Sequence, residues 1–423
     1  MNAIGLLLGL LVLSYLGSIL VSGRTIRGFG LPSGAEYLLL GFVFGPSVLG
    51  VINGSLLEAF APVLVVGTAW VTLCAGLGYG QVGSRPVRVP RAVVGILFAA
   101  LVAAGVSGAV FLGFSVARVG VSDVRLWTAL AAGAVCSETT RHAVRWVAER
   151  HGARGDLSDT IADYARASAL VPAALLAVLF AAAPGHGLPE SPLVERVGLT
   201  LAIGVLLGMV SALLLGREFR RDESWGILLG VSLLGIGIAA RLGLSCVSTT
   251  FFLGLTVTLV SPHRSELKFM VAPTERPVLL PVLVLAGASV HVTGQPAFLI
   301  LVGCGLIGRL LMDLMRGAIL SRAIPSARPA GSWLGLGMLP IGAFSLSSAL
   351  AYQLRVPGAG GAEILAFAAV SALLGELLGP LTLRRALTRA KNIDSTRPPP
   401  EPARTSSANA PRSSGSTTRR EPT

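Results

Sequence analysis

A small set of ionisable residues interrupts long apolar stretches of this sequence. They are Glu138, Asp163, Arg166, Arg309, Asp313 and Glu376. A charged side chain at the centre of a bilayer costs about 2.5–3.5 kcal/mol on insertion scales, so such residues face a bundle interior, pair with one another or lie near an interface. A carboxylate held there can bind a proton or a cation in turn. Each of these carboxylates, Asp163 and Glu138 included, is therefore a candidate for ion or proton binding.

Hydroxyl side chains surround one of these carboxylates. The stretch AAGAVCSETTRHAVRW places Ser137, Thr139 and Thr140 on either side of Glu138. Hydroxyl and backbone oxygens are the ligands that hard cations prefer. We expect these three residues to contribute oxygen ligands to an ion.

A second interrupted stretch, GSWLGLGMLPIGAFSLSSA, contains Gly335, Gly337, Pro340 and Gly342. Proline removes a backbone donor, and glycine tolerates an unwound backbone. Residues 137–140 fall in the fifth predicted span and this stretch in the twelfth; the span numbers differ by seven, an odd number, so the two run in opposite directions. Inverted pairs of broken helices form the ion sites of many secondary transporters, although glycine-rich packing explains either stretch alone.

Two arginines are spaced to neutralise two of the carboxylates. Arg166 follows Asp163 by three residues, and Arg309 precedes Asp313 by four, so each pair shares a helix face. Structural pairing of this kind would give a neutral bundle that binds no ion. Arg166 beside Asp163 would also compete with a transported cation. Ion binding and structural pairing both remain open from the sequence.

The elements that position these residues are membrane-spanning helices. Of the 423 residues, 53% are hydrophobic and only 13% are charged. Apolar runs of about 20 residues recur, and a helix of that length crosses a bilayer. We predict an all-α polytopic membrane protein of about thirteen transmembrane helices, with inverted repeats and two broken crossing helices. The predicted spans are 3–22, 34–52, 57–79, 93–116, 125–148, 159–183, 194–216, 225–242, 245–261, 278–292, 297–320, 331–354 and 362–386.

Arginine and lysine gather in alternate loops. The odd-numbered loops, near residues 24–27, 85–91, 150–154, 217–221, 264–276 and 322–328, are rich in basic residues, and the even-numbered loops are not. Cytoplasmic loops carry this excess. We expect a multi-pass protein of a bacterial-type inner membrane, with its N-terminus outside and its C-terminus in the cytoplasm.

Two segments follow from this organisation: a transmembrane domain over 1–388 and a disordered basic cytoplasmic tail over 389–423, which is rich in Pro, Ser, Thr and Arg. Topology and anionic lipids account for the net charge of +13, so we expect no nucleic-acid partner. The four cysteines have no metal-ligand spacing, and no nucleophile–base grouping indicates an enzyme. We expect no metal and no cofactor.

Several segments together resemble the monovalent cation:proton antiporter-2 family over most of the chain. LPSGAEYLLLGFVFGPSVLG (31–50) is similar to the second-span signature, with Gly45-Pro46-Ser47 its most specific part. Further similarity lies in GTAWVTLCAGLGYG (67–80), SETT (137–140), GLSCVSTTFFLGLTVTLVSPHRSEL (243–267), PVLLPVLVLAGASV (277–290), IGRLLMDLMRG (307–317) and LGLGMLPIGAFSLSSAL (334–350).

The resemblance implies a homodimer that exchanges protons for Na⁺ or K⁺ by alternating access. The family has an Asn-Asp or Asp-Asp pair in the sixth span. The only plausible match in this sequence is Ala162-Asp163, so the first member of the pair is missing. An alternative alignment puts Arg166 at the position of the carboxylate. The family's basic residue falls on Arg309, which would hold Glu138 or Asp163 in the resting state. The departures in the sixth span leave a second expectation: an antiporter-fold membrane sensor or partner protein that does not transport.

Overall fold

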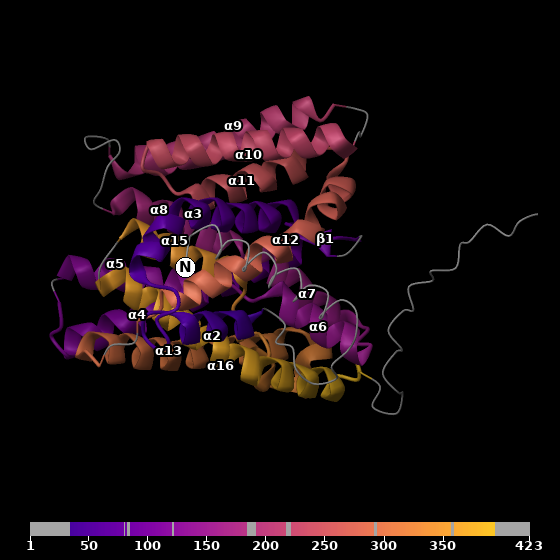
Figure 1. The fold of residues 1–423 in the computed structure, drawn as a ribbon. Coiled ribbons are helices and arrows are strands. Elements are labelled where there is room, and N and C mark those ends of the chain that lie inside the picture. Colours follow the sequence, from indigo (N-terminus) through magenta and orange to yellow (C-terminus); the bar gives the residue numbers. More distant parts are fainter. Residues whose placement is uncertain are drawn as a thin grey trace, which may run out of the picture.

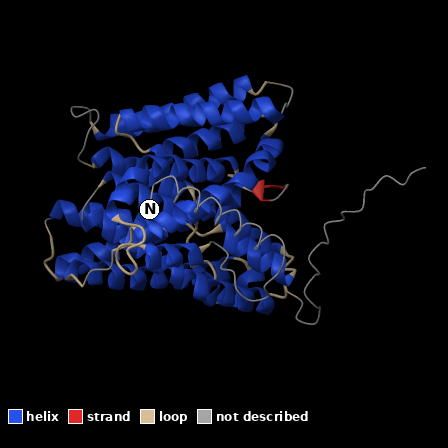
Figure 2. Ribbon diagram, viewed as in Figure 1, coloured by secondary structure: helices blue, strands red, loops and turns tan. Residues whose placement is uncertain are grey.

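The computed structural model describes residues 34–79, 81–82, 85–120, 122–183, 192–216, 221–291, 294–356 and 359–393. Helices make up nearly all of this part of the chain (Figure 2), and its one hairpin pairs β1 (Gln81–Val82) with β2 (Arg85–Pro86). The predicted first span, 3–22, lies outside the described residues. Helices account for each of the other predicted spans.

One group of helices, which we call the scaffold, packs around α3 and α11. Its members are α2 (Ala35–Phe44), α3 (Gly54–Leu77), α9 (Leu193–Leu214), α10 (Arg221–Arg241), α11 (Cys246–Val260) and α12 (Arg264–Ala288). Figure 1 shows α9, α10 and α11 stacked at one side of the molecule.

The second group, which we call the core, packs around α4, α13 and α16 at the opposite side (Figure 1). Its members are α4 (Val89–Val116), α5 (Ser122–Cys136), α6 (Arg141–His151), α7 (Asp156–Ala167), α8 (Leu170–Ala182), α13 (Pro296–Ala323), η1 (Pro325–Ala330), α14 (Trp333–Leu336), α15 (Ala343–Arg355) and α16 (Ala359–Arg389). Contacts of α15 with α3 and of α8 with α9 join the core to the scaffold.

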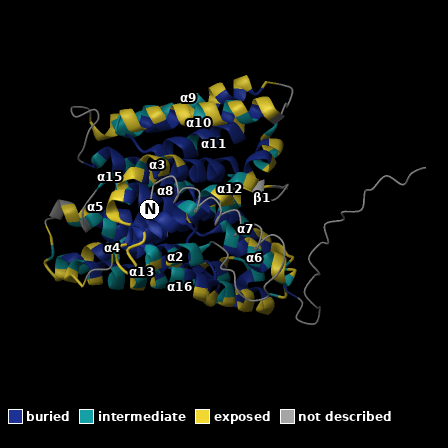
Figure 3. Cartoon of the chain, in the orientation of Figure 1, coloured by how far each residue is buried: buried dark blue, intermediate teal, exposed yellow. Residues whose placement is uncertain are grey.

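Length and apolar character make this a multi-pass membrane protein. Eight helices in the described residues are long and apolar enough to cross a bilayer, and α2 and α11 are shorter apolar helices. The outer helices expose large apolar side chains (Figure 3), such as Leu213 on α9 at 77% and Leu97 on α4 at 62%. Such an apolar outer surface is compatible with contact to the hydrocarbon tails of lipids.

One predicted boundary was wrong by several turns. The tenth span was predicted to begin at residue 278, but α12 already begins at Arg264 and continues through Pro273, Pro277 and Pro281. Prolines are tolerated inside membrane helices because neighbouring groups satisfy the freed backbone. They therefore do not mark the end of this helix.

The predicted breaks in spans five and twelve are present. The first separates α5 from α6 at residues 137–140, and the second separates α14 from α15 at residues 337–342. The sequence left two roles open for the glycines of the second break, an unwound backbone and close packing, and Gly335, Gly337 and Gly342 do not adopt a positive φ. They let backbones approach closely: a Cβ on Gly335 would overlap the backbone of α13, and one on Gly337 would lie 2.8 Å from the Cα of Leu383.

The chain remains ordered beyond the end of α16. Asn392 accepts a hydrogen bond from the Ser158 amide at 3.2 Å through its side chain, and its backbone carbonyl accepts one from the Arg154 amide at 2.9 Å. Residues 390–393 thus pack against the start of α7. Residues 394–423 lie outside the described residues, so the predicted disordered tail stays a prediction there.

Candidate functional site

The two broken helices cross and bind each other through their unwound backbones. The amide of Thr140 donates to the Pro340 carbonyl at 2.9 Å. The Thr139 hydroxyl donates to the Met338 carbonyl at 3.2 Å. Unwinding frees backbone groups that helices would otherwise satisfy, and the two breaks supply partners to one another. We call this region the crossing.

Glu138 lies at the crossing and caps a helix of the other broken span. Its Oε2 accepts hydrogen bonds from the Ser345 amide and the Ser345 hydroxyl, both at 2.9 Å. Ser345 is in the first turn of α15, where free amides and the helix dipole favour a negative charge. The Glu138 side chain is buried, with Oε1 against Gly342. These two hydrogen bonds favour the ionised carboxylate, and they oppose the cost of burying its charge.

Two arginines from α13 bind the carbonyl ends of the other half-helices. Arg309 donates to the carbonyls of Cys136, which ends α5, and of Leu339. Arg316 donates to the Thr139 hydroxyl at 3.0 Å and to the Met338 carbonyl at 3.1 Å. The carbonyl end of a helix carries partial negative charge, which a cation stabilises. At this crossing, two guanidinium groups supply that positive charge.

Asp313 lies between the two arginines. Its carboxylate is 2.7 Å from Nη2 of Arg316 and 3.8 Å from Nε of Arg309, and all three side chains are almost fully buried. The predicted proximity of Arg309 and Asp313 is therefore present. With Glu138, the crossing holds two buried acids and two buried bases, so its fixed charges balance.

Asp163 has a different partner from the one its spacing suggested. Its Oδ2 is 3.6 Å from Nη1 of Arg91 on α4, and Arg91 also binds Asp156 at the start of α7. Among the residues that the structure describes, Arg166 makes no ion pair with Asp163; its side chain lines the cavity described below, and Asp163 is not part of that lining. Because α7 packs along α4, Asp163 is fully buried against the base of that helix. Arg309 likewise contacts neither Glu138 nor Asp163 among its hydrogen bonds and ion pairs.

The predicted hydroxyl ligands are all buried at the crossing. Ser137 donates to the Ala134 carbonyl at 2.7 Å, and Thr140 caps α6 by accepting from the His142 amide at 3.3 Å. Thr139 also receives a hydrogen bond from Arg316. All three hydroxyls thus have hydrogen-bond partners within the protein, and ion ligation by them stays a prediction.

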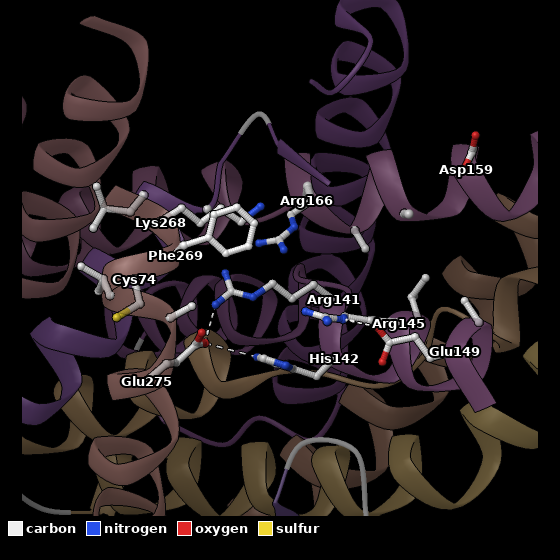
Figure 4. Close-up of a pocket in the computed structure, with 18 of the residues that line it drawn as sticks. Cys74, Arg141, His142, Arg145, Glu149, Asp159, Arg166, Lys268, Phe269 and Glu275 are labelled. Carbon is white, nitrogen blue, oxygen red and sulfur yellow. Dashed lines mark hydrogen bonds and ion pairs between the residues drawn. The ribbon is translucent and has the colours of Figure 1, made fainter. Parts of the chain in front are cut away.

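A cavity of about 670 Å³ opens between the core and the scaffold. Its walls come from the end of α3, from α6 and α7, and from the first half of α12 (Figure 4). All of these ends belong to the side that the basic loops predict to be cytoplasmic. At its inner end, Glu275 of α12 binds Arg141 of α6, and His142 lies 3.2 Å from the same carboxylate oxygen. This contact joins the two groups of helices directly.

The sequence analysis missed four residues of this region: Arg91, Arg141, Glu275 and Arg316. Arg91 and Arg141 lie in the first turns of α4 and α6, and Glu275 lies in the middle of α12 but before the predicted start of that span at residue 278. Arg316 had a usable signal, since it follows Asp313 by three residues on one helix. The partners of Arg91 and Glu275 are distant in sequence, and no local spacing predicts them.

Comparison with solved structures identifies the class of fold. The chain has the fold of a sodium/proton antiporter. A structure of the sodium proton antiporter MjNhaP1 from Methanocaldococcus jannaschii at pH 8 superposes with a TM-score of 0.63 and 16% identity, covering 92% of this chain and 98% of that one. An electron-microscopy structure of the same antiporter gives a TM-score of 0.64 and 15% identity over 94% of this chain and 100% of that one.

Sequence comparison adds nothing to this likeness. No protein-family model matches the chain, and no curated protein matches it. The predicted antiporter fold with two broken crossing helices is therefore confirmed by structure. Assignment to the antiporter-2 branch in particular stays a prediction.

Proposed function

We propose that this protein is a secondary active transporter that exchanges protons for a monovalent cation, Na⁺ or K⁺, by alternating access. The observation that carries the proposal is the crossing of two broken helices with the buried carboxylate of Glu138 at its centre. The fold supports the same class of activity, because structures of this architecture include a sodium proton antiporter.

Glu138 is the carboxylate best placed to carry the exchange. It belongs to the same unwound segment as Thr140, one turn before Arg141 and His142 at the inner end of the cavity. When ionised, it is held by the first turn of α15; when protonated, it gives up that interaction with the helix end. Binding a proton or a cation would therefore change how the two broken helices hold each other.

Alternating access needs two bodies that can move. The core carries Glu138 and Asp163, and the scaffold carries Glu275, so the Arg141–Glu275 contact must break when one body moves against the other. That contact closes the inner end of the cavity. The family resemblance implies a homodimer, and we include it in this proposal. A dimer contact between the two scaffolds would fix them in place while each core moves.

The test is dissipation of a pH gradient by the purified protein in liposomes, with Na⁺, K⁺ and Li⁺ added in turn. We expect cation-dependent proton movement that is lost in Glu138→Gln and kept in Glu58→Gln. Glu58 is a matched control because it is an exposed carboxylate near the start of α3, outside both the crossing and the cavity lining. Equal activity of wild type and Glu138→Gln would refute the assignment of the exchanging carboxylate, and Asp163→Asn then tests the other candidate.

A second candidate function is a sensor or partner protein that does not transport. The observation that favours it is that arginines neutralise the buried acids: Arg91 faces Asp163, and Arg309 and Arg316 face Asp313 and the freed carbonyls. In this function no ion need enter. Correctly folded protein that moves no protons with any of the three cations would favour this candidate over exchange.

A further inference from the structure

The cavity between core and scaffold is more basic than a path for cations would require. Four of its lining side chains are basic, Arg141, Arg145, Arg166 and Lys268, and three are acidic, Glu149, Asp159 and Glu275. With His142 neutral, the formal charge of the lining is positive. A lining of this sign favours the binding of anions.

Arg166 is the cation in this lining whose charge the protein itself does not neutralise. Arg141 binds Glu275, and Arg145 binds Glu149 at 2.6 Å. Among the residues that the structure describes, none forms a hydrogen bond or ion pair with the Arg166 guanidinium, although the side chain is largely buried. An arginine placed this way loses hydration without gaining a partner, which is costly unless a ligand supplies the counter-charge.

The position of Arg166 makes this cost larger. A Cβ built on Gly78 at the end of α3 would lie 2.6 Å from Nη1 of Arg166 and 3.4 Å from Nη1 of Arg141. The two nitrogens are therefore no further apart than the sum of these distances. Figure 4 shows both guanidinium groups in the same part of the cavity, with Lys268 and Phe269 reaching toward it from α12. Like charges gather here around open space.

We propose that this cavity binds a phosphate oxyanion, with Arg166 as its principal ligand and Lys268 as a second. The planar fork of an arginine binds two oxygens of a phosphate group at once, and an ammonium group adds a point charge. The cavity has room for a phosphate together with the group that bears it. The anion would contact α7 of the core and α12 of the scaffold together. The inference does not rest on ion exchange.

The bound phosphate group could belong to free phosphate or to the headgroup of an anionic lipid, and the experiment distinguishes these two ligands. The first arm is calorimetric titration of inorganic phosphate into the full chain in phosphatidylcholine nanodiscs at constant ionic strength. The second arm is native mass spectrometry of the protein after exposure to phosphatidylglycerol. Saturable phosphate binding identifies a soluble anion, and retained phosphatidylglycerol without phosphate binding identifies a lipid headgroup.

Four variants locate the site. Arg166→Gln should weaken binding by about tenfold or more, because a charge-assisted bidentate contact is lost. Arg166→Lys should give an intermediate loss, since it keeps the charge and loses the fork. Gly78→Ala should displace the Arg166 guanidinium without straining the backbone, because Gly78 has a φ of −83°. Arg322→Gln is the matched control: it removes one exposed arginine from the same predicted side of the membrane, outside the cavity.

Helical content by circular dichroism and elution on size exclusion check that each variant is folded. If Arg166→Gln fails to fold, Gly78→Ala and Lys268→Gln carry the test, with a loss of several-fold expected in each. The proposal is overturned if wild type binds neither ligand, or if Arg322→Gln weakens binding as much as the cavity variants do. The second result would mean that general surface charge attracts the anion.

Discussion

Arg316 should be among the most destabilising positions in the core. Its guanidinium makes two hydrogen bonds across the crossing, to Thr139 and Met338, and an ion pair of 2.7 Å with Asp313. Removing one partner of a buried pair costs about 3–5 kcal/mol. Because Arg309 also faces Asp313, at 3.8 Å, we expect Arg316→Gln to fall at the lower end, about 3 kcal/mol.

The assay is thermal unfolding of purified protein in detergent, followed by intrinsic fluorescence or by loss of the monodisperse species. At about 2 °C for each kcal/mol in a chain of this size, the midpoint should fall by about 6 °C. Arg322→Gln, an exposed position further along α13, should leave the midpoint within about 1 °C, as surface substitutions usually do.

A double variant separates the ion pair from the hydrogen bonds. In Asp313→Asn/Arg316→Gln the carboxylate no longer lacks its partner, so the loss should be smaller than the sum of the two single losses by about 1–3 kcal/mol. Additive losses would mean that Arg316 acts through its hydrogen bonds alone. A midpoint for Arg316→Gln equal to that of Arg322→Gln would refute the assignment of Arg316 as the residue that holds the crossing together.

Three further predictions concern packing, the cavity and the exchange. Gly335→Ala should lower the free energy of unfolding by about 3 kcal/mol, because its Cβ would overlap the α13 backbone. Gly303 has open space around it, so Gly303→Ala should leave the free energy of unfolding unchanged or raise it slightly. Glu275→Gln should increase the rate of maleimide labelling of Cys74, a thiol that lines the cavity, by about tenfold, because it removes a charge-assisted contact between α12 and α6. An unchanged labelling rate would mean that this contact does not close the cavity. Glu138→Gln should abolish cation-dependent proton movement in liposomes while the protein keeps its fold, and an active variant would exclude Glu138 as the exchanging group.

The sequence predicts the architecture well because the signals for it are local. Apolar length identifies each span, and proline, glycine and hydroxyl residues next to a charge indicate where a span unwinds. The breaks at residues 137–140 and 337–342 both carried that signature. The opposite directions of the two spans followed from counting alone.

The partners of the buried charges could not be predicted in the same way. Spacing on one helix paired Arg309 with Asp313 correctly, but the same rule suggested Arg166 for Asp163, and the structure places Arg91 there. Arg91 comes from a different helix, so only the packing of α4 against α7 brings it close. Spacing of three or four residues shows which charged side chains can pair along one helix. Packing between helices decides which of these pairs form and which side chains bind a partner from another helix instead.

The role of the glycines in the second break was also beyond the sequence. A glycine is compatible with an unusual backbone angle and with close packing, and its spacing does not distinguish the two. In the structure, the backbones of α13 and α16 pass so close to Gly335 and Gly337 that a side chain at either position would overlap them.

The balance of buried charge at the crossing bears on how the protein responds to the membrane voltage. Moving one elementary charge through a potential of 100 mV changes the free energy by about 2.3 kcal/mol. Glu138 and Asp313 offset Arg309 and Arg316, so displacement of these four side chains together carries no net charge through the electric field. Any current recorded during turnover would then report the transported ions and the charges elsewhere in the moving body. A proton or a cation bound at Glu138 would add one positive charge to this balance, so reorientation of the loaded crossing would depend on the membrane potential.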